Sequence, residues 1–395
     1  MWAQDAFRVS LSPLFYAFRF SHFFLMSGSK TDWLLSAPTA ASNPRAETPL
    51  YPFLAKLLRG EDLTGREAAD FYTALTDPKT GSNQIAAALT ALTIKGETFE
   101  ELAGMALVMR DQATHIRALQ KNAVDITGTG SSPAKTFNVS TAAAFVAAGA
   151  GLMIAKQSNR GVATRVGSAD VLTELGVKVA SEPSVAQTSL NGVAISFLFA
   201  PKFHASLKRV AEVRRSLGIR TCLNLLGVLA NPAGVNRSLI GVWHQSMVEP
   251  AAKALALLKT DKSWVVYGSD GLDEITLAGP TLVAETIARQ TRGFQIAPKD
   301  FGLKPAPIDH LRAKTAKESA KIIREVLSSK RRDEARSLVV MNAAAALIVG
   351  GFSKEPMHAA RLAEQSLDSG QAQNKLDRLI QLTNKPAKSI PPRKN

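Results

Sequence analysis

The sequence predicts an α/β protein with a small N-terminal helical domain and a larger domain built on a mainly parallel central sheet. Its 395 residues are 46% hydrophobic, so the chain can bury a large core in two domains. Helical patterns with short loops fill the part before residue 120. After that point, short apolar runs typical of buried strands alternate with helical patterns, which favours a sheet covered on both faces. We therefore expect a helical domain at 48–119 and an α/β domain at 120–384.

Both ends of the chain are predicted to lie outside these domains. Residues 1–47 read as an extension and linker. The apolar run 11–26 is too short and too interrupted to span a bilayer, and no small-residue cleavage site follows it promptly. Translation could begin at Met1 or at Met26. The basic segment 385–395 is expected to be a disordered tail.

Four helices are predicted in the helical domain. The first covers 51–58, the second begins at the capping box 64–67, the third is capped by Ser82 or Asn83, and the fourth begins at the capping box 98–101. In each box a Thr hydroxyl and a Glu carboxylate satisfy N–H groups of the first turn. Short helices with short loops indicate a small bundle.

The larger domain is predicted from alternating elements. The strand-like runs are 124–127, 151–155, 193–199, 238–242, 263–267 and 293–297. The helical patterns are 203–217, 247–259, 280–290, 316–327 and 337–349. This alternation predicts parallel strands joined by crossover helices.

The stretch after the first strand has the composition of an anion-binding site. The turn 128–130, Gly-Thr-Gly, leads through a polar loop to a helix that opens at 138–141. N–H groups at a helix start are unpaired, and the helix dipole is positive there. The second predicted strand delivers Lys156, Asn159 and Arg160 beside this turn, where two cations suit a polyphosphate. Taken alone, such a turn is as often only a tight strand-to-helix connection.

Charge and cysteine content narrow the class of protein. The formal net charge of +15 is compatible with nucleic-acid binding, but no Lys/Arg-rich stretch is interleaved with aromatic residues. A solvated basic surface that attracts anionic substrates is the simpler interpretation, and nucleic acid is the minority one. The single cysteine, Cys222, lies in an apolar run and excludes an intramolecular disulfide. This favours a reducing compartment and predicts a cytoplasmic protein.

Three motifs together resemble the anthranilate phosphoribosyltransferase family. They read GTG…TFN-x-ST, K-x-x-NR and GSADVLTELG, and they run from Gly128 to Gly176 without a gap. Segments of the helical domain and of the closing helices also resemble the family, so the likeness covers about residues 50–384. It implies a nucleoside phosphorylase- and phosphoribosyltransferase-like fold and a homodimer formed through the small domain. The implied reaction is Mg²⁺-dependent transfer of the phosphoribosyl group from phosphoribosyl pyrophosphate to anthranilate, a step of tryptophan biosynthesis.

The resemblance implies a metal site. Asp273 and Glu274, in the acidic loop after the strand predicted at 263–267, match the family's adjacent acidic pair, and Ser140 matches its metal-contacting serine. Mg²⁺ suits this set because it is usually shared between one or two carboxylates and substrate phosphates. An acidic loop after a strand is otherwise most often a solvated turn.

The resemblance also implies substrate contacts, with no covalent intermediate. Arg214 falls on the arginine that binds the anthranilate carboxylate, and Lys156 with Asn159 would help to position the reactants. The residues expected to bind substrate are Gly128, Ser131, Ser132, Thr136, Asn138, Ser140, Thr141, Lys156, Asn159, Arg160, Thr164, Ser168 and Arg214.

Three segments depart from the family pattern, all at the expected substrate site. Residues 131–133 are Ser-Ser-Pro in place of Gly-Asp-Gly, Gln157 and Ser158 replace His and Gly, and 205–206 read Ala-Ser in place of Pro-Ala. Two alternative functions therefore stay open: a related transferase or phosphorylase with another aromatic acceptor, and a non-enzymatic relative that binds nucleic acid.

Overall fold

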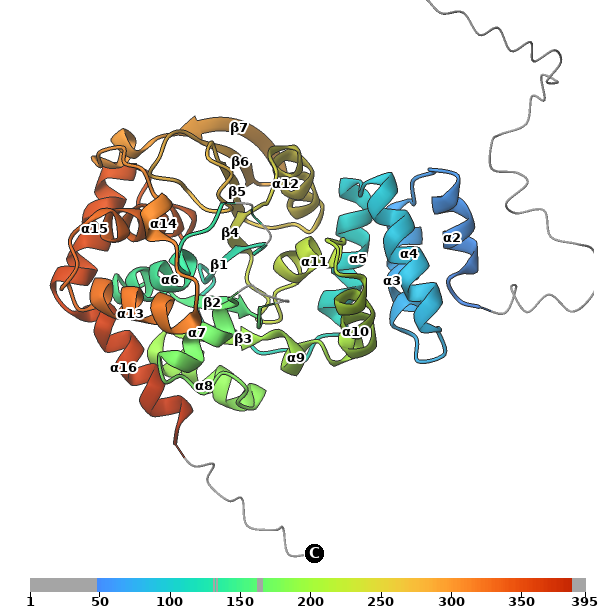
Figure 1. The fold of residues 1–395 in the computed structure, drawn as a ribbon, viewed down its shortest axis with the longest axis horizontal. Helices are drawn as coiled ribbons and strands as arrows, with labels where there is room; N and C mark the ends of the chain where they lie inside the picture. Colours follow the sequence, from blue (N-terminus) through green and yellow to red (C-terminus); the bar gives the residue numbers. More distant parts are fainter. Residues whose placement is uncertain (1–47, 131, 133, 162–165, 386–395) are drawn as a thin grey trace, which may run out of the picture. The chain divides into compact units, whose positions relative to one another are not determined.

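The computed structural model describes residues 48–130, 132, 134–161 and 166–385 (Figure 1). The predictions for the 1–47 extension and for the tail beyond 385 lie outside the described residues. In the described part of the chain, no helix combines the length and the apolar character needed to cross a membrane.

The predicted helical domain is confirmed. Its helices are α2 (Tyr51–Leu58), α3 (Gly65–Thr76), α4 (Ser82–Lys95) and α5 (Phe99–Asp111). Thr64 and Thr98 each cap a helix as predicted, and both capping boxes are complete. The predicted cap of α4 is wrong: Gly81 is the N-cap, without a side-chain hydrogen bond, because Ser82 is already the first helical residue.

The second capping box is tied into the bundle core, which makes it testable. Glu101 is fully buried and accepts hydrogen bonds from the N–H groups of Thr98 (2.9 Å) and Leu63 (2.8 Å). We expect Thr98→Ala to lower the free energy of unfolding by about 1 kcal/mol, because the N–H of Glu101 loses its partner. Urea unfolding measures this. Thr73→Ala, the same change at an exposed site within α3, is the control and should cost less than about 0.5 kcal/mol.

A seven-stranded sheet forms the larger domain, in the order β3-β2-β1-β4-β5-β6-β7. Its strands are β1 (Val124–Gly128), β2 (Ile154–Ser158), β3 (Ile195–Phe199), β4 (Arg237–Gly241), β5 (Lys262–Gly268), β6 (Thr281–Ile287) and β7 (Gln290–Ile296). Strands β1 to β5 are parallel, whereas β6 and β7 are antiparallel. The mainly parallel sheet is therefore confirmed. The chain adds β2 and then β3 on one side of β1, and it adds β4 on the other side. The strand order therefore reverses between β1 and β4.

One predicted helix and several strand boundaries are wrong: the strand predicted at 293–297 runs over 290–296, and the one predicted at 193–199 begins at 195. Residues 280–290 form strand β6 and a hairpin turn, because four β-branched side chains suit a strand that pairs with β5 along its length. Ala288 and Arg289 both have positive φ, 47° and 69°, as a two-residue hairpin turn requires. The second strand runs over 154–158 instead of 151–155, so Lys156 lies inside the strand and not beyond its end.

Helices cover both faces of the sheet. They are α6 (Val139–Gly149), α7 (Ser168–Glu174), α8 (Pro183–Val193), α9 (Ala200–Phe203), α10 (Lys208–Leu217), α11 (Leu223–Leu229), α12 (Val248–Leu257), α13 (Ala316–Leu327), α14 (Glu334–Val349), α15 (Pro356–Asp368) and α16 (Gln371–Thr383). The predicted helix at 203–217 is divided into the end of α9, a 3₁₀ turn and α10.

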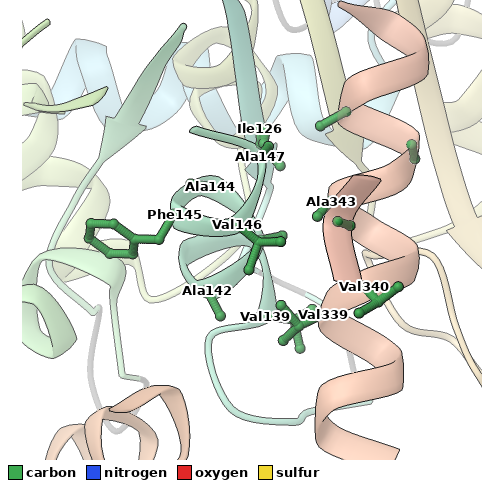
Figure 2. Close-up of a cluster of buried hydrophobic side chains, with 14 of the residues drawn as sticks. Ile126, Val139, Ala142, Ala144, Phe145, Val146, Ala147, Val339, Val340 and Ala343 are labelled. Atoms are coloured by element: carbon green, nitrogen blue, oxygen red, sulfur yellow. The ribbon is translucent and has the colours of Figure 1, made fainter. Parts of the chain in front are cut away.

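Successive strand residues point to opposite faces, and each face packs into a different core. On one face, Ile126 packs with α6 and α14, whose facing side chains include Val146 and Val339 (Figure 2). Small alanines let these two helices approach closely, and residues Val139 to Ala148 of α6 are all buried. On the other face, Ile240 and Val265 belong to a core that continues through α11 and α12 into the helical domain. The start of α6 is thereby held rigidly beside the end of β1.

Candidate functional site

The acidic loop after β5 lies across the ends of β1 and β4, where the strand order reverses. Gly128 and Gly241 are opposite each other in the sheet register and are the last residues of these strands. A Cβ atom on Gly241 would lie 1.7 Å from the carbonyl oxygen of Asp273, and one on Gly128 would lie 2.9 Å from it. Both strand ends therefore need glycine so that the acidic loop can lie on them. Open α/β sheets bind their ligands at such a point.

Both predicted acids are held by backbone N–H groups at this point. Asp273 Oδ2 accepts hydrogen bonds from the N–H of Gly130 (2.8 Å) and the hydroxyl of Thr129 (3.3 Å). Glu274 Oε1 accepts one from the N–H of Ser140 (3.2 Å), in the first turn of α6. The structure thus brings together all three residues predicted to hold a metal ion.

Lys156 lies beneath the same turn. Its side chain is buried, and its ammonium donates to the carbonyl of Ile126, to Thr127 Oγ1 (3.1 Å) and to Ser140 Oγ (3.2 Å). The three protons of the ammonium are used by these three oxygens. Lys156 therefore supports the hydroxyl of Ser140 from inside the protein.

The buried charges of this cluster do not balance. Asp125, Asp273 and Glu274 all interact electrostatically with Lys156, so three carboxyl groups face one ammonium. Burial and the neighbouring Asp273 raise the pKa of Glu274 to about 7, although Lys156 and Ser140 act in the opposite direction. Burial also raises the pKa of Asp125. If all three carboxyl groups and the ammonium were ionised, the cluster would carry a formal charge of −2, which a divalent cation would neutralise.

The donor set fits Mg²⁺ shared with a substrate. Asp273, Glu274 and Ser140 offer hard oxygen atoms, which Mg²⁺ prefers. Across the described ranges, no group of three or more His, Cys, Asp or Glu side chains is arranged to hold a metal ion by itself. An ion at this site would therefore need oxygen ligands from a bound phosphate as well.

The other residues of the predicted phosphate cradle surround this cluster. Ser132 Oγ donates to the carbonyl of Gly271, which joins the loop after β1 to the acidic loop. Asn138 is held by Ser319 of α13, whose hydroxyl contacts both its N–H and its side-chain oxygen at 3.0 Å. Thr141 is fully buried, and its hydroxyl has no hydrogen-bond partner in the described structure. The Thr136 hydroxyl donates to the carbonyl of the next residue. Ser131, Pro133 and Thr164 lie outside the described residues.

The turn after β2 is organised by an acid that the sequence interpretation did not include. Asp170 accepts from the N–H of Gly161 (2.8 Å) and pairs with Arg160 (3.1 Å). Arg160 also lies over the ring of Phe199 and is largely exposed. Asn159 uses its side-chain oxygen on the N–H of Arg160, and the Ser168 hydroxyl accepts from the N–H of Asn159. Asn159 and Ser168 are thus neighbours, whereas the Arg160 charge is engaged away from the acidic cluster.

Arg214 and Gln157 lie at opposite ends of α11. Arg214 is on α10, close enough to Cys222 to interact electrostatically, and burial lowers its pKa. Among the described residues no carboxylate forms an ion pair with Arg214. Gln157 Nε2 lies 3.4 Å from where a Cβ of Gly227 would be, and Gln157 Oε1 is buried without a partner in the described chain. In the described structure, the Arg214 guanidinium without a carboxylate partner and Gln157 Oε1 without a hydrogen-bond partner therefore both lie beside α11, whose apolar side chains belong to the core shared with the helical domain.

His204, which directly precedes the segment 205–206 that departs from the family pattern, is buried and neutral. Burial lowers its pKa from 6.5 to about 4, and its Nε2 has no partner within the described residues. The folded state therefore resists protonation, while the unfolded chain binds a proton below about pH 6.5. The contribution of neutral His204 to the free energy of unfolding is fully present above pH 6.5 and is lost as the pH falls through 4. This contribution is about 3 kcal/mol at most. We expect the free energies of unfolding of wild type and His204→Gln to converge over this window. Parallel curves in chemical denaturation would contradict this assignment.

Two residues that sequence reasoning missed hold the acidic loop. Gly241 leaves room for the backbone of Asp273 at the end of β4. Asn342, in the buried helix α14, accepts from the N–H of Ile275 (3.0 Å) and donates to its carbonyl (2.9 Å), so it fixes the residue that follows Glu274. A lone amide in the otherwise apolar run 338–349 was a usable signal, because a buried amide needs partners.

The fold and the site define the class of protein. Residues 120–373 match the α/β domain of the glycosyl transferase family, and residues 51–113 match its helical bundle domain. The chain is 42% identical over 330 residues to anthranilate phosphoribosyltransferase of Desulfosudis oleivorans, covering 84% of this chain and 97% of that protein. It is 40% identical over 346 residues to that of Rhodospirillum rubrum, covering 88% and 99%. This chain belongs to the anthranilate phosphoribosyltransferase family.

Solved structures agree. Anthranilate phosphoribosyltransferase of Thermus thermophilus superposes with a TM-score of 0.79 at 34% identity, covering 84% of this chain and 98% of that one. The Saccharomyces cerevisiae enzyme, in complex with PRPP and Mg, gives a TM-score of 0.78 at 27% identity, covering 86% and 99%. The family resemblance stated from the sequence motifs is confirmed.

Proposed function

We propose that this chain transfers the phosphoribosyl group of phosphoribosyl pyrophosphate to the amino group of anthranilate, with Mg²⁺, in tryptophan biosynthesis. The observation that carries the proposal is the cluster of Asp273, Glu274 and Ser140 at the start of α6. With its carboxylates ionised the cluster is negatively charged, its acids accept from N–H groups of the turn and of α6, and it needs a divalent cation and phosphate oxygens to be complete. The membership of the family supports the same reaction.

The reaction breaks the bond between the anomeric carbon and pyrophosphate and forms a carbon–nitrogen bond to the arylamine, which then loses a proton. Positive charge develops on the ribose and negative charge on the leaving pyrophosphate. The positive end of the α6 dipole is fixed beside that leaving group and stabilises it without reorganising, while the N–H groups of Gly130 and Ser140 hold Asp273 and Glu274. Asp273 and Glu274 would hold the Mg²⁺ ion, which when bound would neutralise negative charge on the phosphate groups. Lys156 keeps the Ser140 hydroxyl in place.

The acceptor is held on the other side, along α11. A partly buried guanidinium that has no carboxylate partner in the described structure needs an anion, and the anthranilate carboxylate is the matching group for Arg214. Gln157 Oε1 lies at the other end of α11 and can accept a hydrogen bond from an arylamine N–H. Holding both substrates in line is the main catalytic contribution of the protein.

A fluorescence assay tests the proposal. Purified protein with Mg²⁺ should consume the fluorescence of anthranilate only when phosphoribosyl pyrophosphate is present, and pyrophosphate should appear in equal amount. Chelation of Mg²⁺ with EDTA should stop both. If high enzyme concentrations leave the anthranilate signal unchanged, the proposal is wrong.

A second candidate is transfer to another aromatic acceptor. Gln157, in place of the family's histidine, favours it because a neutral amide alters the hydrogen bonds offered to the acceptor. A panel of substituted anthranilates, other arylamines and nucleobases, each with phosphoribosyl pyrophosphate, separates the candidates. Activity with other acceptors and none with anthranilate would favour this second function.

We also propose that the chain forms a homodimer through its helical domain. Three large apolar side chains on the described helices α2, α4 and α5 are exposed, namely Leu58, Ile94 and Leu107, and Ile94 is 82% exposed. Burial of such side chains favours association. Light scattering should give twice the mass of 42.2 kDa, and Ile94→Asp should shift it towards the monomer. A monomer in both cases would exclude this assembly.

A further inference from the structure

Strands β1 and β2 separate immediately after they meet. Their pairing consists of one residue pair, Val124 with Ile154, whereas β1 pairs with β4 along all five of its residues. The carbonyl and N–H groups of β2 that face β1 beyond that pair need other partners, because they are buried. Three side chains supply partners: Thr127, whose hydroxyl donates to the carbonyl of Gln157 at 3.3 Å, and the pair Asp125 and Asn231.

Asp125 and Asn231 occupy the gap between the strands. The amide of Asn231 donates to Asp125 Oδ2 and to the carbonyl of Ala155, each at 2.7 Å. Asp125 Oδ1 accepts from the N–H of Gln157 at 3.2 Å. Asn231 Oδ1 accepts from the N–H of Ala233 at 2.9 Å, so both ends of its amide are in use. Asp125 is fully buried and Asn231 is 4% exposed.

These contacts bracket Lys156. One holds the carbonyl of the residue before it, and the other holds the N–H of the residue after it. The separation of the strands also frees the carbonyl of Ile126, which the Lys156 ammonium reaches together with Ser140 Oγ. Asp125 is in addition the strongest of the carboxyl groups that favour a charged Lys156.

We propose that Asp125 and Asn231 are positioning residues: they keep β1 and β2 apart and hold the Lys156 ammonium against Ser140, beneath the phosphate cradle. The pair acts on phosphoribosyl pyrophosphate through Lys156 and touches neither substrate. The expected effect of this pair on catalysis rests on the proposed function. The claim that the pair holds the Lys156 ammonium against Ser140 does not.

The experiment compares Asp125→Asn with Glu285→Gln. Glu285, on β6, is also a buried carboxylate of this sheet. It is 3% exposed, accepts a hydrogen bond from Trp264 Nε1 at 2.9 Å and is not part of the acidic cluster. Both changes replace a buried carboxyl group by an amide with little change of shape. In the presence of Mg²⁺, Asp125→Asn should raise the Kd and KM for phosphoribosyl pyrophosphate by about 10- to 100-fold, as loss of a supporting partner does at other sites. The KM for anthranilate should stay within about twofold. Glu285→Gln should lower the melting temperature and leave both constants unchanged.

A second variant and a crystal structure complete the test. Asn231→Asp keeps the acceptor for Ala233 but loses both donated hydrogen bonds, so it should reproduce the loss of affinity. In crystals of either variant, the Lys156 ammonium should have left Ser140. If it stays within hydrogen-bond distance of Ser140, or if Asp125→Asn behaves like Glu285→Gln, the proposal is overturned. A wild-type protein without affinity for phosphoribosyl pyrophosphate would instead overturn the proposed function, while the crystal structures would still decide where the lysine lies.

Discussion

Replacing Asp273 by Asn together with Glu274 by Gln should lower kcat/KM on the order of 10³-fold. The two carboxylates lie beside the first turn of α6, and the neutral amides that replace them would not hold a divalent cation beside the leaving pyrophosphate. The same variant should not unfold. Burial and mutual repulsion raise the pKa of Glu274, so removing the charge relieves the folded protein in the absence of Mg²⁺. Steady-state kinetics and thermal melting measure the two effects separately.

Binding of Mg²⁺ provides the sharper readout. In wild type, Mg²⁺ with pyrophosphate should raise the melting temperature, because a ligand that binds only the folded state stabilises it. The double variant should lose this rise. Asp309→Asn is the matched control, since Asp309 is a highly exposed acid. Unchanged activity or an unchanged Mg²⁺ response in the double variant would refute the role of the acidic pair.

Gly241→Ala should lower kcat by on the order of 10²-fold, although the change adds only one methyl group. That methyl carbon would lie 1.7 Å from the carbonyl oxygen of Asp273 and 2.3 Å from its carbonyl carbon. Both are backbone atoms, so the acidic loop itself must move away from the start of α6. Overpacking of this kind also costs about 1–3 kcal/mol of stability. Kinetics and urea unfolding on the same preparation measure both losses.

Gly293→Ala is the control for this substitution. Gly293 belongs to β7 of the same sheet, and a Cβ there would meet its nearest neighbour at 3.9 Å, an ordinary contact. It should change kcat by less than about twofold. If Gly241→Ala is as active as Gly293→Ala, the acidic loop does not depend on contact with the strand ends.

Local chemistry explains which parts of this protein were predictable. The capping boxes at Thr64 and Thr98 are contacts between residues three apart, so the sequence contains all of their information. The motifs around Ser140, Lys156 and the acidic pair could be recognised only in combination, because each taken alone has other common uses. The segment 280–290 failed for the opposite reason. Its apolar pattern suits a helix or a strand, and only pairing with β5 selects the strand.

The sequence by itself determined the element types of the helical bundle, the parallel character of the sheet and the identity of the acids and cations at the proposed site. The tertiary structure alone decided how they meet. Strand order brings Gly128 beside Gly241 and lays Asp273 across both, while the gap between β1 and β2 turns Lys156 inward. The physical reason is the separation in sequence of the residues that interact. Caps and turns are set by neighbours in the chain, whereas a site at the reversal of strand order depends on hydrogen bonds between residues more than a hundred positions apart.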